Sequence, residues 1–182
     1  MNAPARKIRC VVTGHNDEGK AIVAEDTLVE PITLDLLPGY EFHRLWSRDE
    51  RPVFPDDGRP RRAVEYFPPA NGSRFAVFTL PPDEQVVLSE GFDVGAALEQ
   101  MEAALPGMAG HMEPDNPGMH RTDSIDYLYV ASGQAILELD DGVEVEVRAG
   151  DTIVQNGTRH AWRNRSDEPC VIVVTLIGAD RG

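Results

Sequence analysis

The sequence predicts an all-β protein, a sandwich or barrel, with one short helix. Many short segments alternate apolar and polar side chains, and glycine, aspartate and asparagine separate them. Val143 to Arg148 alternates without interruption, as a strand with one face in water does. The preceding Asp140-Asp141-Gly142 favours a tight hairpin, because these residues tolerate positive φ. We therefore expect residues 134–139 and 143–147 to pair antiparallel.

The N-terminal part contains four more widely spaced strand-like segments. They are Ile8 to Thr13, Ala21 to Val23, Tyr40 to Trp46 and Arg74 to Leu80. We expect residues 1–90 to form a β extension that packs on the barrel or pairs with it, in the same chain or in a partner subunit. A degenerate second barrel is the alternative. Residues 48–71, rich in proline and charge, are predicted to be a long surface loop.

A helix and its connection are expected at residues 91–109, followed by the barrel core. The helix should run from about Val94 to Leu105, because its apolar residues share one side and Pro106-Gly107 ends it. Residues 110–182 should form the core of what we expect to be a single domain. The strand-like segments of this core are Ser124 to Ala131, Gln134 to Leu139, Val143 to Val147, Thr152 to Gln155, His160 to Asn164 and Cys170 to Ile177.

Charge and composition argue against two classes of partner. The chain has 17 Lys and Arg against 31 Asp and Glu, a formal net charge of -14, which repels nucleic acid and anionic membranes. It contains no apolar run of about 18 residues, so no membrane span or signal peptide is predicted.

Cys10 and Cys170 lie in apolar segments and are expected to be buried thiols in a reducing, cytoplasmic environment. A disulfide is the alternative if the two segments meet.

Two histidines and a carboxylate predict a metal site. His120 and Asp126 have the same strand parity, so in an unbroken strand their side chains emerge on one face. His160 belongs to a later segment, on the other side of the predicted hairpin, which can bring the three side chains together. Two imidazoles and a carboxylate suit Fe, Mn, Ni or Zn. We expect one divalent metal ion, with coordination positions left for water or substrate.

The order and spacing of these residues resemble the two conserved motifs of the cupin superfamily, in its small, RmlC-like, cupin-2 form. The resemblance covers about residues 110 to 178 and implies a double-stranded β-helix, or jelly-roll, barrel. The matching positions are His120, Asp126 and Gly133 in the first motif and Gly150, Gly157, His160 and Asn164 in the second. By this placement His120, Asp126 and His160 are the metal ligands.

The chain departs from the family motifs at three positions. Thr122 replaces the second histidine, Asp126 is shorter than the usual glutamate, and Gln155 replaces a proline. At most three of the four family ligands remain, unless His111 or Glu113 reaches in from the preceding loop.

Other residues near the motifs are expected to form the rest of the pocket. The predicted substrate-binding residues are Thr122, Trp162, His111, Glu113 and Gln155. Arg121, Arg159 and Arg163 have the opposite strand parity and are expected in solvent, although a β-bulge would turn one of them toward a carboxylate substrate. His15 and His43 are interpreted as ordinary core or surface residues, and Asn164 as a turn residue.

The resemblance implies a metal-dependent enzyme that acts on a small carboxylate or an oxygenated, even aromatic, molecule. A dioxygenase or a decarboxylase or lyase would fit, and this choice rests on analogy. A non-catalytic module that binds a small ligand or a metal is the alternative, which Thr122 favours; a structural scaffold is a third interpretation. Similar small cupins dimerise through strands outside the motifs, which implies a homodimer formed through residues 8–46.

Overall fold

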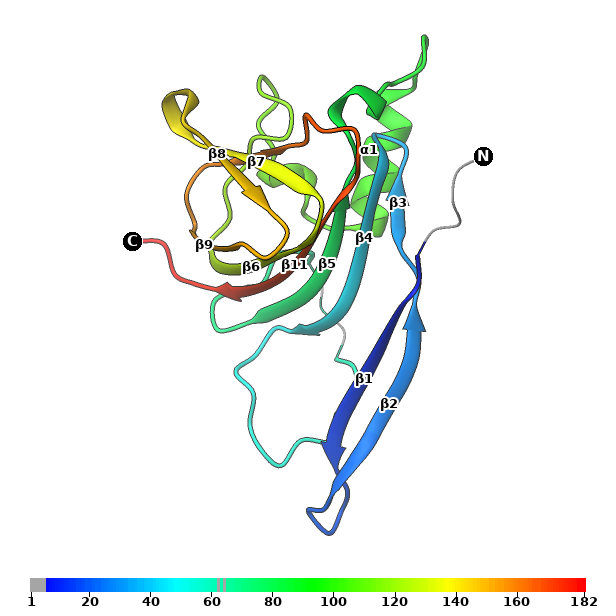
Figure 1. Ribbon diagram of the computed structural model, residues 1–182. Helices are drawn as coiled ribbons and strands as arrows, with labels where there is room; N and C mark the ends of the chain where they lie inside the picture. The colour runs from blue at the N-terminus through cyan, green and yellow to red at the C-terminus, as the bar shows by residue number, and fades with distance from the viewer. Residues whose placement is uncertain (1–5, 62, 64) are drawn as a thin grey trace.

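The computed structural model describes residues 6–61, 63 and 65–182, and they form a β-barrel with one helix and a projecting hairpin (Figure 1). The strands are β1 (Ile8–His15), β2 (Ala21–Val29), β3 (Ile32–Leu34), β4 (Leu37–Arg48), β5 (Ser73–Leu80), β6 (Ser124–Ser132), β7 (Gln134–Glu138), β8 (Glu144–Arg148), β9 (Thr152–Asn156), β10 (Ala161–Arg163) and β11 (Cys170–Gly178). The helix is α1 (Val94–Ala104), and three short 3₁₀ turns are η1 (Asp83–Gln85), η2 (Ala109–His111) and η3 (Asp140–Gly142).

The barrel has two antiparallel sheets. The larger has the strand order β3-β4-β5-β11-β6-β9 and the smaller the order β10-β7-β8. In Figure 1 the smaller sheet lies above the curved strands β6, β11 and β5. The apolar side chains that form the core come from both sheets and from α1. The predicted all-β barrel with one short helix is therefore confirmed.

Most of the N-terminal part is built into the larger sheet. β5 pairs antiparallel with β11 over residues 73–80 and, on its other side, with β4. Strands β4 and β5 of the N-terminal part thus belong to the same sheet as barrel strand β11 of their own chain. The hairpin of β1 and β2 forms a sheet of its own and extends away from the barrel (Figure 1).

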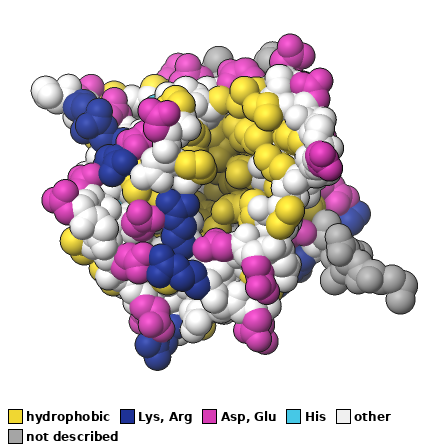
Figure 2. Space-filling model, turned by 90° about the horizontal axis from the view of Figure 1, so that it is seen from above, with side chains coloured by type: hydrophobic (Ala, Val, Ile, Leu, Met, Phe, Trp, Pro, Cys, Tyr) yellow, Lys and Arg dark blue, Asp and Glu magenta, His cyan; other side chains and the backbone are white. Residues whose placement is uncertain are grey.

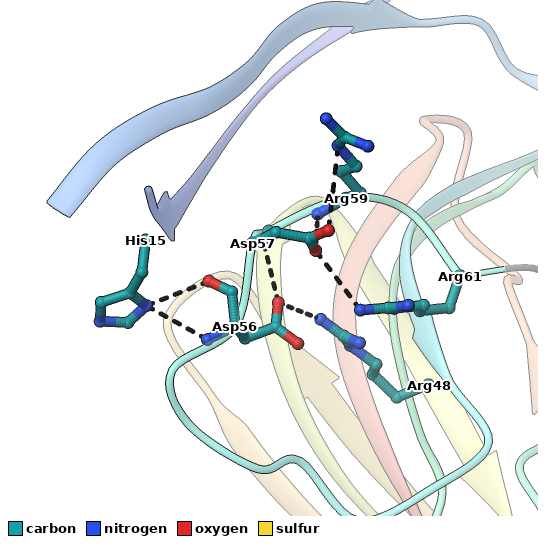
Figure 3. Close-up of polar contacts among 7 residues, drawn as sticks. His15, Arg48, Asp56, Asp57, Arg59 and Arg61 are labelled. Carbon is teal, nitrogen blue, oxygen red and sulfur yellow. Dashed lines mark hydrogen bonds and ion pairs between the residues drawn. The ribbon is translucent and has the colours of Figure 1, made fainter. Parts of the chain in front are cut away.

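The tip of this hairpin is fastened to the loop that follows β4. A Cβ on Gly14 would lie 2.3 Å from the carbonyl oxygen of Asp57, so only glycine permits this approach. Figure 3 shows the polar contacts: the main-chain N–H of Asp56 donates to Nδ1 of His15 at 3.3 Å, and the Asp56 carboxylate accepts from Arg48 at 2.6 Å. The first half of the loop is therefore held in place by hydrogen bonds to β1 and β4.

In the barrel core, side chains alternate between the interior and the outer face as the sequence pattern predicts. Along β6, Asp126 and Leu128 are buried, whereas Tyr127 and Tyr129 are 48% and 47% exposed on the outer face. The opposite orientation of the tyrosines follows from the alternation of side chains along a strand. The predicted hairpin is confirmed, since β7 pairs with β8 and Asp141 has φ 58 in the turn between them.

Helix α1 closes one side of the core. Asp93 caps its first turn by accepting a hydrogen bond from the N–H of Ala96 at 3.0 Å, and Leu105, the C-cap, precedes Pro106. Its buried residues, Ala97 and Met101, lie four positions apart and so share one face. No helix within the described residues is long and apolar enough to cross a membrane.

Candidate metal and ligand site

His120 and His160 lie side by side inside the barrel. Each precedes a strand, His120 on the segment before β6 and His160 directly before β10. Their main chains form a two-residue bridge in which each N–H donates to the other carbonyl at 2.9 Å. The two imidazole centroids are 4.2 Å apart, and His160 is 3% exposed. This bridge is what brings together two residues that are 40 positions apart in sequence.

A hydrogen bond fixes the tautomer of each ring. Nδ1 of His120 lies 2.9 Å from the carbonyl oxygen of Gly118, and Nδ1 of His160 lies 2.9 Å from that of Thr158. A carbonyl oxygen only accepts, so each Nδ1 carries the proton and each Nε2 keeps a free lone pair. Neither Nε2 has a hydrogen-bond partner among the described residues. Histidines that bind a metal through Nε2 are held in this way.

Burial keeps both rings neutral. It lowers the pKa of His160 to about 4, and the nearby charge of His120 acts in the same direction. Burial also lowers the pKa of His120, against the raising effect of its bond to Gly118. Both imidazoles are therefore unprotonated at neutral pH, which metal binding requires.

Asp126 lies on the interior face of β6 and is 6% exposed. Its Oδ1 accepts a hydrogen bond from Oγ of Ser124 at 2.6 Å, and burial raises the pKa of its carboxyl group to about 6. Among the residues that the structure describes, no three His, Cys, Asp or Glu side chains are grouped closely enough to hold a metal ion. Of the three predicted ligands, the structure pairs the two histidines, and Asp126 is bonded to Ser124 instead.

The raised pKa of Asp126 leads to a prediction for the metal-free protein. The folded state binds the proton more tightly than the unfolded state, so stability falls as the pH rises from the ordinary carboxyl pKa of 3.8 to about 6 and stays low above it. Asp126→Asn should therefore raise the free energy of unfolding at pH 7.5 by about 1–3 kcal/mol. Because both states are protonated at low pH, the gain should shrink toward zero near pH 4.

Urea unfolding of both proteins in EDTA, at pH 4.5 and 7.5, measures this difference. Asp115→Asn is a matched control, because Asp115 is exposed and the substitution removes the same charge. An Asp126→Asn variant that is less stable than the parent at pH 7.5 would contradict the conclusion that the ionised, buried carboxylate destabilises the folded state.

Aromatic rings enclose the histidine pair. The ring of Phe67 stacks against His120 with a centroid distance of 6.5 Å, and Trp162 lies edge-on to His160 at 6.3 Å. Tyr66, next to Phe67, is partly buried against the core, and removal from water raises its pKa to about 12. Phe67 and Tyr66 belong to residues 48–71, so the prediction that this whole segment is a surface loop is wrong at its C-terminal end. The signal for this was an aromatic pair in an otherwise charged segment.

Two predicted pocket residues, Thr122 and Gln155, are held by local hydrogen bonds. Oγ1 of Thr122, which is 1% exposed, lies 2.9 Å from Oγ of Ser124. Gln155 faces Asp126 across β9 and β6, and its amide donates to the side chain and carbonyl of Thr158. The contacts of Gln155 with Thr158 orient the turn that precedes His160.

The predicted residues of the preceding loop lie farther out. Nδ1 of His111 donates to the carbonyl oxygen of Arg121 at 3.0 Å, and its ring contacts Phe67 with a centroid distance of 4.7 Å. Both carboxylate oxygens of Glu113 accept from Arg159 at 2.6 Å. Arg159 was expected in solvent, but a carboxylate 46 positions away in sequence holds it. Arg163, with the same expectation, is mostly buried and pairs with Glu138 at 2.7 Å.

The barrel is open at one end. Figure 2, which looks down on the end where the β7–β8 hairpin and α1 lie, shows a deep hollow lined mainly by hydrophobic side chains and rimmed by charged ones. A concave apolar site with few polar groups is typical of small-molecule binding.

Comparisons with known proteins match the C-terminal part of the chain. Residues 109–176 match the family described as the cupin domain, Cupin_2. Phomopsin biosynthesis cluster protein C' of Diaporthe leptostromiformis is 54% identical over 48 residues, 26% of this chain and 25% of that protein. Oryzines biosynthesis cluster protein J of Aspergillus oryzae is 42% identical over 50 residues, 28% of each chain. This chain thus matches about a quarter of the length of these curated relatives.

Among solved structures, a predicted oxalate decarboxylase from Thermotoga maritima is similar. It has 16% sequence identity and a TM-score of 0.43, and the alignment covers 82% of this chain and 93% of that one.

Proposed function

We propose that the protein is a metal-dependent enzyme that acts on a small molecule, because residues 109–176 match the cupin domain family. The observation that carries the proposal is the fixed tautomer of His120 and His160, whose Nδ1 atoms donate to carbonyl oxygens. Two neighbouring neutral imidazoles with free Nε2 lone pairs suit a divalent ion such as Fe, Mn, Ni or Zn.

The remaining residues of the interior have separate roles in this proposal. Asp126 supplies the third ligand, as the sequence predicts, once its carboxylate leaves Ser124. Phe67 and Trp162 exclude water and present ring faces to an oxygenated or aromatic substrate. The ion, when bound, would polarise a carbonyl or carboxylate group of that substrate.

A small carboxylate or oxygenated molecule is the substrate class that we propose. The hollow of the barrel is open at one end and largely apolar (Figure 2). The relatives of the matched segment are named for biosynthesis clusters, which favours a small biosynthetic molecule over a macromolecule. A dioxygenase and a decarboxylase or lyase both remain within this proposal.

A non-catalytic binding module is the second candidate function. Thr122 stands where a ligand would be, and its hydroxyl group is engaged by Ser124, so this position adds no ligand for a metal. Elemental analysis of the purified protein, followed by turnover assays with small carboxylates under air and under nitrogen, separates the candidates. Stoichiometric metal with turnover supports the enzyme; binding of a small ligand without metal supports the module.

We also propose a homodimer in a reducing, cytoplasmic environment. Both cysteines are free thiols, in keeping with such an environment. The β1–β2 hairpin exposes four large aliphatic side chains: Val11 is 50%, Ile22 40%, Val23 64% and Leu28 62% exposed. A second copy of the chain would cover these apolar side chains.

Light scattering after size exclusion should give twice the 20.0 kDa mass of the chain. Replacing Val23 and Leu28 by glutamate should shift the protein to the monomer mass, because charges would be buried in the interface. Val143→Glu, at a 52% exposed valine beside the β7–β8 turn, is the control that should remain dimeric. A monomeric parent protein would rule the dimer out.

A further inference from the structure

A recess beside the loop of residues 110–114 gathers three arginines. It has a volume of about 500 Å³ and lies between the loop of residues 110–114, the segment before β6, Arg159 and the C-terminal Arg181. Arg121, Arg159 and Arg181 all line it. They are three of only 17 basic residues in a chain with a net charge of -14. A concentration of positive charge on so acidic a protein indicates a site for an anion.

Two of these arginines are already neutralised. Arg159 holds both oxygens of Glu113 and also contacts Asp140 at 2.9 Å. Arg181 pairs with Asp123 and donates to the carbonyl oxygen of Thr122 at 3.1 Å. These ion pairs fix the two guanidinium groups in the wall of the recess. They also engage both carboxylates that line it, Glu113 and Asp123.

Arg121 is the third arginine of the recess. It is exposed, and no carboxylate of the described residues forms an ion pair with it. Its main chain is held, because its carbonyl oxygen accepts from Nδ1 of His111 at 3.0 Å. The charge of Arg121 also acts on Glu113, another residue of the recess. The pKa of Glu113 is lowered mainly by the hydrogen bond from Arg159 and further by the charge of Arg121.

We propose that this recess binds a small oxyanion, a carboxylate or phosphate group, through Arg121. The planar guanidinium group donates two parallel hydrogen bonds to either oxyanion. The residues that line the recess include neither His120 nor His160. Binding here therefore requires no metal and goes beyond the proposed reaction.

Calorimetric titration of the full chain in EDTA and at low salt tests the proposal. Succinate and inorganic phosphate are the two probes, and the one that binds more tightly identifies the group that the recess prefers. Arg121→Gln should weaken binding of that probe about tenfold or more. Arg148→Gln removes the same charge from an exposed arginine of β8 outside the recess, and should change binding less than twofold.

Circular dichroism establishes that both variants fold, as expected for exposed side chains. The proposal is overturned if the parent binds neither probe, or if Arg121→Gln binds as tightly as Arg148→Gln. Because the metal is removed throughout, neither result depends on whether the histidine pair binds an ion.

Discussion

Replacing His160 by alanine should reduce the metal affinity of the protein about a hundredfold or more. The substitution removes one of two Nε2 donors whose tautomer is fixed by a main-chain carbonyl. The ring of His120 and the proposed carboxylate ligand Asp126 are too few to hold a divalent ion tightly, because such ions need at least three ligands in protein sites. Metal content of the purified variant should fall from about one ion per chain to near zero.

His15→Ala is the matched control, since it removes an imidazole from the distant β1–β2 hairpin (Figure 3). Its metal content should equal that of the parent. Elemental analysis and competition with a chromophoric chelator measure both variants. If His160→Ala keeps a stoichiometric, tightly bound metal, the histidine pair does not hold the ion and the proposed function fails.

Asn164→Ala should cause the largest loss of stability, about 3–4 kcal/mol. The side chain of Asn164 is fully buried, and its Nδ2 donates to the carbonyl oxygens of Leu80 and Glu168 at 3.1 and 2.8 Å. Its Oδ1 accepts from both the N–H and the hydroxyl group of Ser166. Alanine would remove these four hydrogen bonds, each worth about 1 kcal/mol, and would leave the buried carbonyl oxygen of Leu80 without this donor.

Thermal unfolding of the metal-free variant should show a midpoint about 10 °C below that of the parent. Asn156→Ala is the control, because Asn156 is exposed and its replacement should change stability by less than about 0.5 kcal/mol. Equal midpoints for the parent and Asn164→Ala would mean that the turn after β10 does not depend on this side chain. The expected result agrees with the interpretation of Asn164 as a turn residue.

Structural features that depend on neighbouring residues in the sequence could be predicted well. The burial of Asp126 and the exposure of Tyr127 follow from strand parity, which depends only on the alternation of neighbouring residues. The β7–β8 hairpin follows from Asp141-Gly142, because the turn requires positive φ. The spacing of the two motifs was enough to identify both histidines of the pair.

Contacts between distant segments could not be predicted in the same way. No local pattern indicates that Phe67 packs on His120, or that Arg159 holds Glu113, because each contact depends on how two remote segments meet. The position of Asp126 shows the same limit. Parity places its side chain in the interior, but the short carboxylate is bonded to Ser124, two residues away.

The pairing of β5 with β11 means that the segment with family similarity cannot be treated as an autonomous folding unit. In a truncated chain that begins near residue 90, β11 would lose its partner along residues 170–177 and present a long unsatisfied edge. Such an edge recruits strands from other molecules, and the fragment would aggregate. Expression and engineering of this protein should therefore keep both halves of the chain together.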